Sequence, residues 1–302
     1  MGSPEFALPT LRLLVEHYPV VGVVTQPDRP AGRGKALTPP PVKLLAAEFG
    51  IEVIQPERLR QPEAFERLQA WKPDVIVVTA FGQILRPNIL EMPPHGCINV
   101  HASLLPRWRG AAPIQAAILH GDKGTGVTIM KMDAGVDTGP ILEQLEETIL
   151  PDDTAGTLAA RLAQAGAELL VATLPGILAG EISPQPQPDQ GATYAGLIRK
   201  NDAKLDLNQP AERLERQVRA FNPAPGAFVY WQGNILKVHR CRAIETRDAI
   251  QGLTGILDGM PALGTGGGWL VLETVQPAGK RAIAGDVFLR GERRWGAPAV
   301  CE

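Results

Sequence analysis

The sequence CINVHASLLPRWRG at residues 97–110 is an apolar run that ends in a loop of small, proline and basic residues. The apolar segment that follows, residues 111–119, is expected to form a helix. Open α/β folds place their ligand sites at the carboxyl ends of buried strands. Asn99 and His101 are two positions apart, so both side chains point to the same face of an extended strand. The stretch therefore predicts a strand that presents an amide donor and a titratable ring together in a crevice.

Apolar runs alternate with amphipathic segments through the first part of the chain. Strands are predicted at residues 20–25, 52–54, 75–79, 97–100, 126–132 and 141–148. Helices are predicted at residues 6–17, 42–49, 62–71, 111–120 and 154–179, with a break in the last one near Pro175-Gly176. Strands that alternate with helices are typical of parallel sheets. The predicted fold class is α/β, with a doubly wound, Rossmann-like parallel sheet.

The character of the sequence changes at residues 183–191, where three prolines exclude a helix or a central strand and predict a semi-extended linker. Beyond it we predict one helix at residues 211–220 and short strands at residues 227–231, 235–239, 268–275 and 287–289. Short strands separated by glycine-rich turns are typical of a small β-barrel. We therefore expect a first domain over residues 1–182, a linker over residues 183–204 and a barrel domain over residues 205–302.

The composition fits a globular chain with two cores, since 302 residues with 44% apolar content can fill both. Three widely spaced cysteines, with no Cys-x-x-Cys pair, support neither a disulfide framework nor a zinc site. No apolar stretch is expected to reach the roughly 20 residues of a membrane span. These features predict a cytoplasmic protein without a membrane segment. The net charge of −2 argues against indiscriminate binding of nucleic acid.

A second polar loop, DAGVDTG at residues 133–139, follows the apolar run at residues 127–130. Glycines on both sides of Asp137 indicate a loop shaped to aim that carboxylate. Asn99, His101 and Asp137 at neighbouring strand ends could serve as an oxyanion donor, an acid or base and its orienting group. A purely structural hydrogen-bonding role for the histidine is the alternative. Because no serine or cysteine is obviously activated nearby, direct transfer between two bound substrates fits better than a covalent intermediate.

Residues 26–41 are rich in proline, glycine and basic side chains and show no apolar periodicity. A loop of this length inside a compact domain is usually functional or disordered. We expect its glycines and prolines to keep the backbone out of regular structure. Arg29, Arg33 and Lys35 are then either ordinary solvated charges or an arm that grips a polyanion.

Several of these stretches together resemble the folate-dependent formyltransferases. The matching stretches are TQPDRPAGRGK at residues 25–35, NVHASLLPRWRGAAPI at residues 99–114, residues 133–139 and RAFNP at residues 219–223. The resemblance runs along nearly the whole chain. It implies a catalytic N-terminal domain, and a C-terminal OB-like barrel that helps to bind tRNA. It further implies transfer of the formyl group of 10-formyltetrahydrofolate to the α-amino group of methionyl-initiator tRNA in translation initiation.

The resemblance also implies roles for residues of the site. Asn99 would donate a hydrogen bond to the oxyanion of the tetrahedral intermediate, and a protonated His101, held by Asp137, would assist. The folate-contacting loop of the family maps onto Ser103, Leu104, Leu105 and Pro106. The loop that meets the acceptor end of tRNA maps onto Arg29, Arg33 and Lys35. No metal and no obligatory protein partner is expected.

Other functions share parts of these motifs. The same active-site signature occurs in formyltransferases that act on glycinamide ribonucleotide, in enzymes that form formate from formyltetrahydrofolate, and in a formyltransferase that acts on an amino-sugar nucleotide. The amino-sugar enzyme is the main alternative, because it resembles this chain in both domains. The basic residues 27–35 and the sequence AFNP at residues 220–223 favour tRNA. A catalytically silent tRNA-binding protein is a rival of another class, against which the intact Asn99, His101 and Asp137 argue.

The resemblance raises one expectation about the start of the sequence. In the family a short apolar strand precedes a Gly-Ser/Thr-Pro turn, whereas here Gly2-Ser3-Pro4 directly follows Met1. We therefore expect the first strand of the sheet to be missing, either through a start assigned at an internal methionine or through a shortened gene. A fold in which a helix simply comes first is the alternative.

Overall fold

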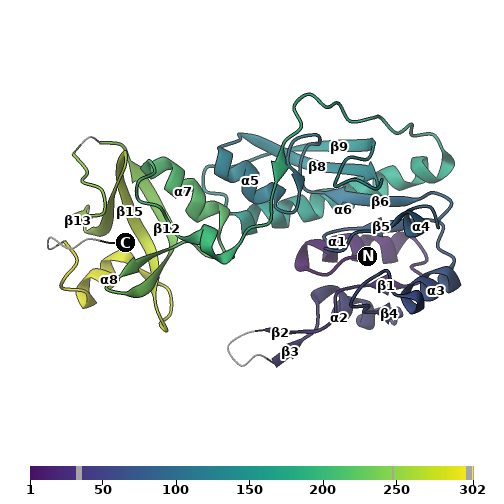
Figure 1. Cartoon of the computed structure of the whole chain (residues 1–302), viewed down its shortest axis with the longest axis horizontal. Helices are drawn as coiled ribbons and strands as arrows, with labels where there is room; N and C mark the ends of the chain where they lie inside the picture. The colour runs from purple at the N-terminus through teal and green to yellow at the C-terminus, as the bar shows by residue number, and fades with distance from the viewer. Residues whose placement is uncertain (32–35, 247, 297–300, 302) are drawn as a thin grey trace. The chain divides into compact units, whose positions relative to one another are not determined.

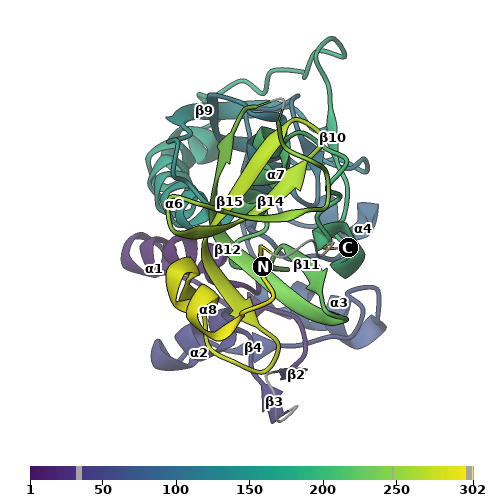
Figure 2. The same cartoon turned by 90° about the vertical axis from the view of Figure 1, so that its left-hand side faces the viewer.

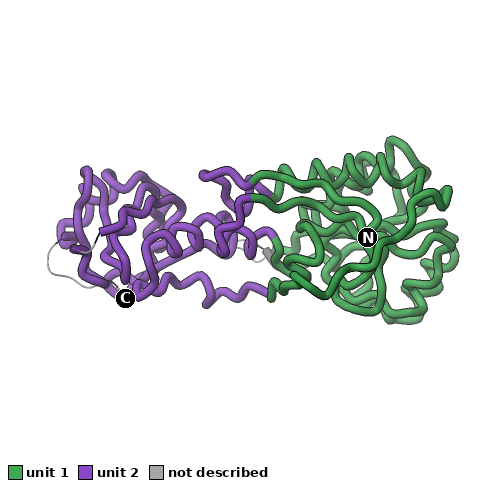
Figure 3. The backbone as a smooth tube through the Cα atoms, turned by 90° about the horizontal axis from the view of Figure 1, so that it is seen from above, with its two compact units in different colours: residues 1–113, 124–148, 159–196 green, residues 114–123, 149–158, 197–302 purple. Residues whose placement is uncertain are grey.

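The computed structural model describes residues 1–31, 36–246, 248–296 and 301, which form two compact units (Figure 3). The N-terminal unit comprises Met1–Pro113, Gly124–Thr148 and Ala159–Gly196. The C-terminal unit comprises Ile114–Lys123, Ile149–Leu158 and Leu197–Glu302. The predicted domain boundaries stay a prediction.

Parallel pairing begins the sheet of the N-terminal unit (Figure 1). β1 (Val23–Val24) pairs with β4 (Val53–Ile54), and β5 (Ile76–Val78) pairs with β6 (Cys97–His101), both in parallel. Met1 and Gly2 join the two pairs, since Gly2 N donates to Val24 O and Thr79 N donates to Met1 O. The expectation of a missing first strand stays a prediction.

Helices cover both faces of these strands, which confirms the α/β class. On one face, Val23 packs in a cluster with η1 (Glu5–Ala7), α1 (Leu8–His17) and α2 (Pro41–Glu48). On the other face, the next residue, Val24, packs in a cluster with α3 (Pro62–Trp71) and α4 (Pro87–Leu90). Successive side chains of a strand point to opposite faces, so two adjacent valines serve two helical layers.

Beyond β6 the sheet departs from the predicted parallel order. β8 (Gly124–Lys131) runs antiparallel to β6, with Thr128 opposite His101, and β9 (Ile141–Thr148) runs antiparallel to β8. The chain leaves β6 at its carboxyl end, forms α5 (Pro113–His120) and enters β8 at that same end. The helix therefore does not return the chain across the sheet. Parallel order was the wrong prediction here, because the sequence of a connecting helix does not reveal whether it crosses the sheet.

α6 (Ala155–Ala179) packs closely on the middle of this sheet. A Cβ on Gly166 would lie 2.8 Å from Val100 Cγ1 and 3.0 Å from Val127 Cγ1, so the helix backbone approaches β6 and β8 directly. The break predicted near Pro175 does not occur, since the helix continues through this residue. Proline removes one hydrogen bond from a helix, and the buried Leu170 and Leu174, which both precede Pro175, anchor the helix in the core.

By length and composition α6 could cross a membrane, contrary to the expectation that no stretch approaches that length. Its most apolar window has a mean hydropathy of 1.5. However, Leu162, Leu170 and Leu174 are each at most 1% exposed, so this side of the helix is buried in protein. One such helix is therefore better explained as a core helix than as a membrane segment.

The two ends of the basic loop pair with each other as the strands of a hairpin. β2 (Arg29–Ala31) pairs with β3 (Ala36–Thr38) in antiparallel order, and the hairpin extends from the N-terminal unit in Figure 1. At its base, the Lys43 ammonium hydrogen-bonds to Asp28 at 2.8 Å, which lowers the pKa of that carboxyl. The prediction of an irregular loop is wrong for the described residues, because an exposed strand such as β3 pairs without any apolar alternation in its sequence.

The predicted linker packs onto the N-terminal unit along its first part. β10 (Tyr194–Ala195) pairs in parallel with β7 (Arg109–Gly110), and Gln185 forms a bridge with Ile141 at the start of β9. We call residues 183–196 the strap. η2 (Lys200–Ala203) follows in the C-terminal unit.

The C-terminal unit is built on a curled antiparallel sheet with strand order β11-β12-β15-β14-β13 (Figure 2). These strands are β11 (Phe228–Trp231), β12 (Asn234–Ile244), β13 (Thr254–Leu257), β14 (Met260–Thr265) and β15 (Gly268–Pro277), and β16 (Ile283–Ala284) pairs with β15. In the order of the described strands, β11 and β13 lie at opposite ends and do not pair, so the sheet is a half-barrel.

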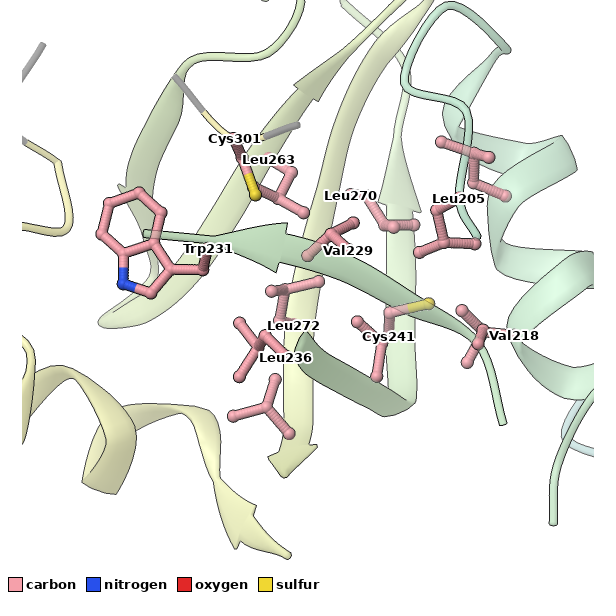
Figure 4. Packing of buried hydrophobic residues seen from close by; sticks show 14 of the residues in the cluster. Leu205, Val218, Val229, Trp231, Leu236, Cys241, Leu263, Leu270, Leu272 and Cys301 are labelled. Carbon is pink, nitrogen blue, oxygen red and sulfur yellow. The ribbon is translucent and has the colours of Figure 1, made fainter. Parts of the chain in front are cut away.

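Two helices cover this sheet, α7 (Ala211–Ala220) and α8 (Gly285–Gly291). Their apolar side chains join the core shown in Figure 4, where Val218 of α7 lies beside Cys241. The strand predicted at residues 287–289 is wrong, since these residues lie in α8. An apolar run of three residues carries too little periodicity to distinguish strand from helix.

The core position of α6 generates a test. Leu170 is fully buried, whereas its neighbour Leu169 is only partly buried. Leu170→Ala should lower the free energy of unfolding by about 2–5 kcal/mol, the usual cost of a cavity of this kind. Leu169→Ala, the matched control, should cost clearly less. Urea unfolding followed by circular dichroism measures both, and equal losses would mean that this face of α6 is not packed in a core.

Candidate active site

Asn99, His101 and Asp137 lie together in the N-terminal unit, as predicted. Asn99 Nδ2 donates to Asp137 Oδ1 at 3.4 Å, and His101 Nδ1 lies 3.7 Å from Asp137 Oδ2. Asn99 is 9% and His101 6% exposed, so both polar groups are removed from bulk water. In such surroundings their interactions with a charge are stronger than in water.

The reason for this meeting differs from the predicted one. Because β8 is antiparallel to β6, the carboxyl ends of the two strands lie at opposite edges, and Met132 N donates to Cys97 O at the start of β6. The loop at residues 132–140 folds back along β6 to bring Asp137 to Asn99 and His101. The three side chains thus meet because this loop folds back, and the prediction that they meet at neighbouring strand ends is wrong.

Two features hold the Asp137 loop in shape. Asp133 Oδ1 accepts hydrogen bonds from Gly135 N at 3.0 Å and from Thr138 Oγ1 at 2.7 Å, which closes the loop on itself. Asp137 has a φ of 52°, a left-handed conformation that is unusual for a residue with a side chain. This conformation turns the carboxylate so that Oδ2 accepts a hydrogen bond from Gly110 N at 2.8 Å.

The orientation of the His101 ring is set by a hydrogen bond at Nε2, the nitrogen that does not face Asp137. His101 Nε2 lies 3.0 Å from Trp108 O. A carbonyl oxygen can only accept, so Nε2 carries a hydrogen and Nδ1 faces Asp137. The ring is thus held between a backbone acceptor and a carboxylate, with one nitrogen left for proton exchange.

The loop predicted to contact folate is fixed largely by its own backbone. Ser103 is fully buried and donates its hydroxyl hydrogen to Arg107 O at 2.6 Å. Thr128 Oγ1 donates to Ser103 O and accepts from Leu105 N, which ties the loop to β8. Leu105 is buried, whereas Leu104 and Pro106 are partly exposed. This loop therefore offers a ligand backbone groups and the faces of Leu104 and Pro106.

The strap supplies site residues that the sequence reasoning missed. Thr193 Oγ1 accepts from Trp108 N at 2.9 Å, and Thr193 O accepts from Arg109 N at 2.9 Å. Gln187 Nε2 donates to Asp137 O at 2.9 Å and to Gly139 O at 2.7 Å. No sequence pattern marked these residues, because a proline-rich stretch shows no periodicity that would predict which side chains face the protein.

The basic residues of the predicted tRNA arm are only partly visible. Arg29 lies in β2 and is exposed, with Nη2 3.5 Å from Gln26 Oε1. Arg33 and Lys35 lie outside the described residues.

Neither candidate nucleophile near the site is activated. Burial raises the pKa of the Cys97 thiol to about 12, so the reactive thiolate is not populated at neutral pH. The Ser103 hydroxyl donates to a backbone carbonyl rather than to a base. Within the described ranges, no three His, Cys, Asp or Glu side chains are grouped as metal ligands would be. The geometry is suited to direct transfer between two substrates.

Comparison of the chain with known proteins shows the family to which it belongs. The model of the formyl transferase family matches residues 10–174, and that of the formyl transferase C-terminal domain matches residues 197–293. A methionyl-tRNA formyltransferase of Halorhodospira halophila is 52% identical over 97% of this chain and 95% of its own length. The chain belongs to the methionyl-tRNA formyltransferase family. A Myxococcus xanthus member is 49% identical over 97% of this chain and 94% of its own length.

More distant members of the fold have other acceptors. A sugar 3N-formyl transferase, solved in the presence of dTDP and 5-N-formyl-THF, superposes with a TM-score of 0.67 over 93% of this chain and 97% of its own. Its identity is only 17%, so it shares the fold and carries no argument about the acceptor. The methionyl-tRNA formyltransferase family is thus set apart from it by sequence rather than by architecture.

Gly110 provides a test of how the family's site is held. It has a φ of 108°, and a Cβ there would lie 2.5 Å from Ala195 O. Gly110→Ala should therefore separate β7 from β10, displace the donor to Asp137 and lower formyl transfer by at least about 100-fold, as expected when reacting groups shift by about 1 Å.

Gly191→Ala is the matched control. Gly191 lies in the strap and, like Gly110, has a positive φ (84°), but no atom lies within 4 Å of its Cβ position. It tests left-handed strain alone and should leave formyl transfer within a few-fold. Steady-state assays of both variants are decisive, and equal activities would mean that Gly110 does not hold the site.

Proposed function

We propose that the chain transfers the formyl group of 10-formyltetrahydrofolate to the α-amino group of methionyl-initiator tRNA, in the cytoplasm, at translation initiation. The observation that carries this proposal is the 52% identity, over nearly full length, to a relative named for this reaction. The amino-sugar alternative rests on a likeness of 17% identity, which supports the fold and not the acceptor.

Asn99 is suited to stabilise the charge that develops during transfer. The neutral amine attacks the formyl carbon, a carbon–nitrogen bond forms, and the carbonyl oxygen becomes an oxyanion. The carboxamide of Asn99 has two N–H donors, and Asp137 engages it at 3.4 Å. The other N–H can point at the oxyanion from a group that is already oriented, which is the most effective form of such stabilisation.

His101 and Asp137 are suited to move the proton. The attacking amine must lose a proton, and the folate nitrogen must gain one when its bond to the formyl carbon breaks. His101 Nδ1 is the nitrogen of the ring that is not bonded to Trp108 O, and it lies 3.7 Å from Asp137. Acting through a water, this pair can accept the proton of the amine and deliver it to the leaving nitrogen.

The partly exposed Leu104 and Pro106, with the backbone of Ser103 and Leu105, suit one face of the flat pterin ring, since such sites combine apolar walls with a few polar groups. We infer that no metal and no obligatory protein partner takes part. For the half-barrel of the C-terminal unit we propose an OB-like class and a part in tRNA binding.

The first test addresses the proposed reaction and its residues. The chain should formylate charged initiator tRNA and not an amino-sugar nucleotide assayed beside it. His101→Ala and Asp137→Ala should each slow transfer about 10²–10⁴-fold, the usual worth of acid–base catalysis, while tRNA binding stays unchanged. Preference for the sugar nucleotide would contradict the assigned acceptor, and near-normal turnover in either variant would contradict the roles of the residues.

The second test addresses the hairpin. We propose that Arg29, Arg33 and Lys35 contact the acceptor end of tRNA, which Arg29 supports by its exposure at the start of the hairpin. Arg33→Ala should raise the KM for tRNA, spare folate binding and make the salt dependence of tRNA binding shallower, because one phosphate contact is lost. Arg12→Ala, on the exposed side of α1, is the control. Identical salt slopes for the two variants would mean that Arg33 is merely solvated.

A further inference from the structure

Gln187 is a residue of the strap whose side chain is hydrogen-bonded to the Asp137 loop. Its Nε2 donates to Asp137 O at 2.9 Å and to Gly139 O at 2.7 Å, the carbonyls on either side of Thr138. Its Oε1 accepts from Arg109 Nε at 3.0 Å. All the polar atoms of this side chain are therefore engaged, and two of the three bonds go to the loop that carries Asp137.

Arg109 determines which way the Gln187 amide points. A guanidinium can only donate, so the oxygen of the amide must face Arg109 and the nitrogen must face the two carbonyls. Arg109 is 5% exposed, and its other described side-chain contact is a long one from Nη1 to Tyr194 Oη at 3.4 Å. Among the described residues no carboxylate pairs with this guanidinium. Its evident contribution is thus to orient Gln187.

The Asp137 loop needs such a support. A left-handed backbone at a residue other than glycine is strained and persists only where the surroundings impose it. The return of the loop is equally tight, since a Cβ on Gly139 would lie 1.9 Å from Lys131 O. Gln187 Nε2 bonds to the carbonyls of both Asp137 and Gly139, and these two hydrogen bonds hold the backbone of the loop in this conformation. The carboxylate is then free to face Gly110, Asn99 and His101.

We propose that Gln187 is a positioning residue that sets the carboxylate of Asp137 by holding the backbone of its loop, and that Arg109 orients Gln187 for this task. The inference rests on the proposed function to the extent that Asp137 acts in formyl transfer. It assigns the strap a part in the reaction through the backbone of the Asp137 loop, since Gln187 donates to the carbonyls of Asp137 and Gly139.

Gln187→Met tests the inference, because methionine keeps the length of the side chain and removes both polar ends. The expected result is a kcat lowered by about 10- to 100-fold, as a displacement of about 1 Å would cause, with KM unchanged for tRNA and for the folate donor. Gln185→Met is the matched control. Gln185 lies two residues away in the strap and is exposed. Its side chain donates to Ser183 O, and its bridge with Ile141 is made by the backbone, so this variant should keep the kcat of the parent chain.

Gln187→Glu is a second variant, which removes the hydrogen bonds to the loop but keeps the interaction with Arg109. A glutamate has the same shape and satisfies Arg109 better than glutamine does, so the variant should fold even if Gln187→Met does not. It cannot donate to the carbonyls of Asp137 and Gly139. The inference predicts that Gln187→Glu loses kcat as Gln187→Met does, whereas full activity in Gln187→Glu would overturn it.

Asp137→Asn in the same assay distinguishes failure of the inference from failure of the proposed function. If Asp137→Asn keeps full activity, the proposed function of the site is wrong. If Asp137→Asn is slow while Gln187→Met and Gln187→Glu are normal, the positioning inference alone is overturned. It is also overturned if Gln187 variants raise the KM for tRNA at unchanged kcat, since Gln187 would then contact the substrate.

Discussion

The hydrogen bond from Gly110 N to Asp137 Oδ2, 2.8 Å long, joins two loops that lie far apart in the sequence. Its donor is fixed because Gly110 belongs to β7, which pairs with the strap at Tyr194 and Ala195. Its acceptor is fixed because Asp137 takes a left-handed backbone. The contacts of Asn99 and His101 with Asp137 depend on both, so a proline-rich segment that resembles a linker is part of the framework of the site.

The antiparallel order of β6 and β8 has consequences for the same site. It places Thr128 opposite His101, where its hydroxyl ties down the backbone of Ser103 and Leu105. It also sends the loop after β8 toward the start of β6, from which the loop must fold back to reach Asn99. The tight, internally bonded form of residues 132–140 follows from this return.

Local signals in the sequence predicted local structure well. The helix at residues 62–71 and the helix at residues 211–220 have the predicted bounds, because each has a clear apolar period and begins directly after or at a proline. The proximity of Asn99, His101 and Asp137 was also predicted, from their residue types and from the glycines that flank Asp137. The direction of β8, the hairpin at β2 and β3, and the contacts of Gln187 and Thr193 could not be predicted. Each depends on pairing between distant segments, for which a single sequence carries no periodic signal.

His101 is held with Nε2 on Trp108 O and with Nδ1 toward Asp137. The chain has 5 histidines, so ¹⁵N NMR of histidine-labelled protein, with His101→Gln for assignment, can resolve the ring nitrogens of this residue. The hydrogen bond to Trp108 O predicts that the neutral ring of His101 carries its hydrogen on Nε2, and that Asp137→Asn shifts the Nδ1 resonance while Nε2 stays protonated. A neutral ring with its hydrogen on Nδ1, or one indifferent to Asp137→Asn, would contradict it.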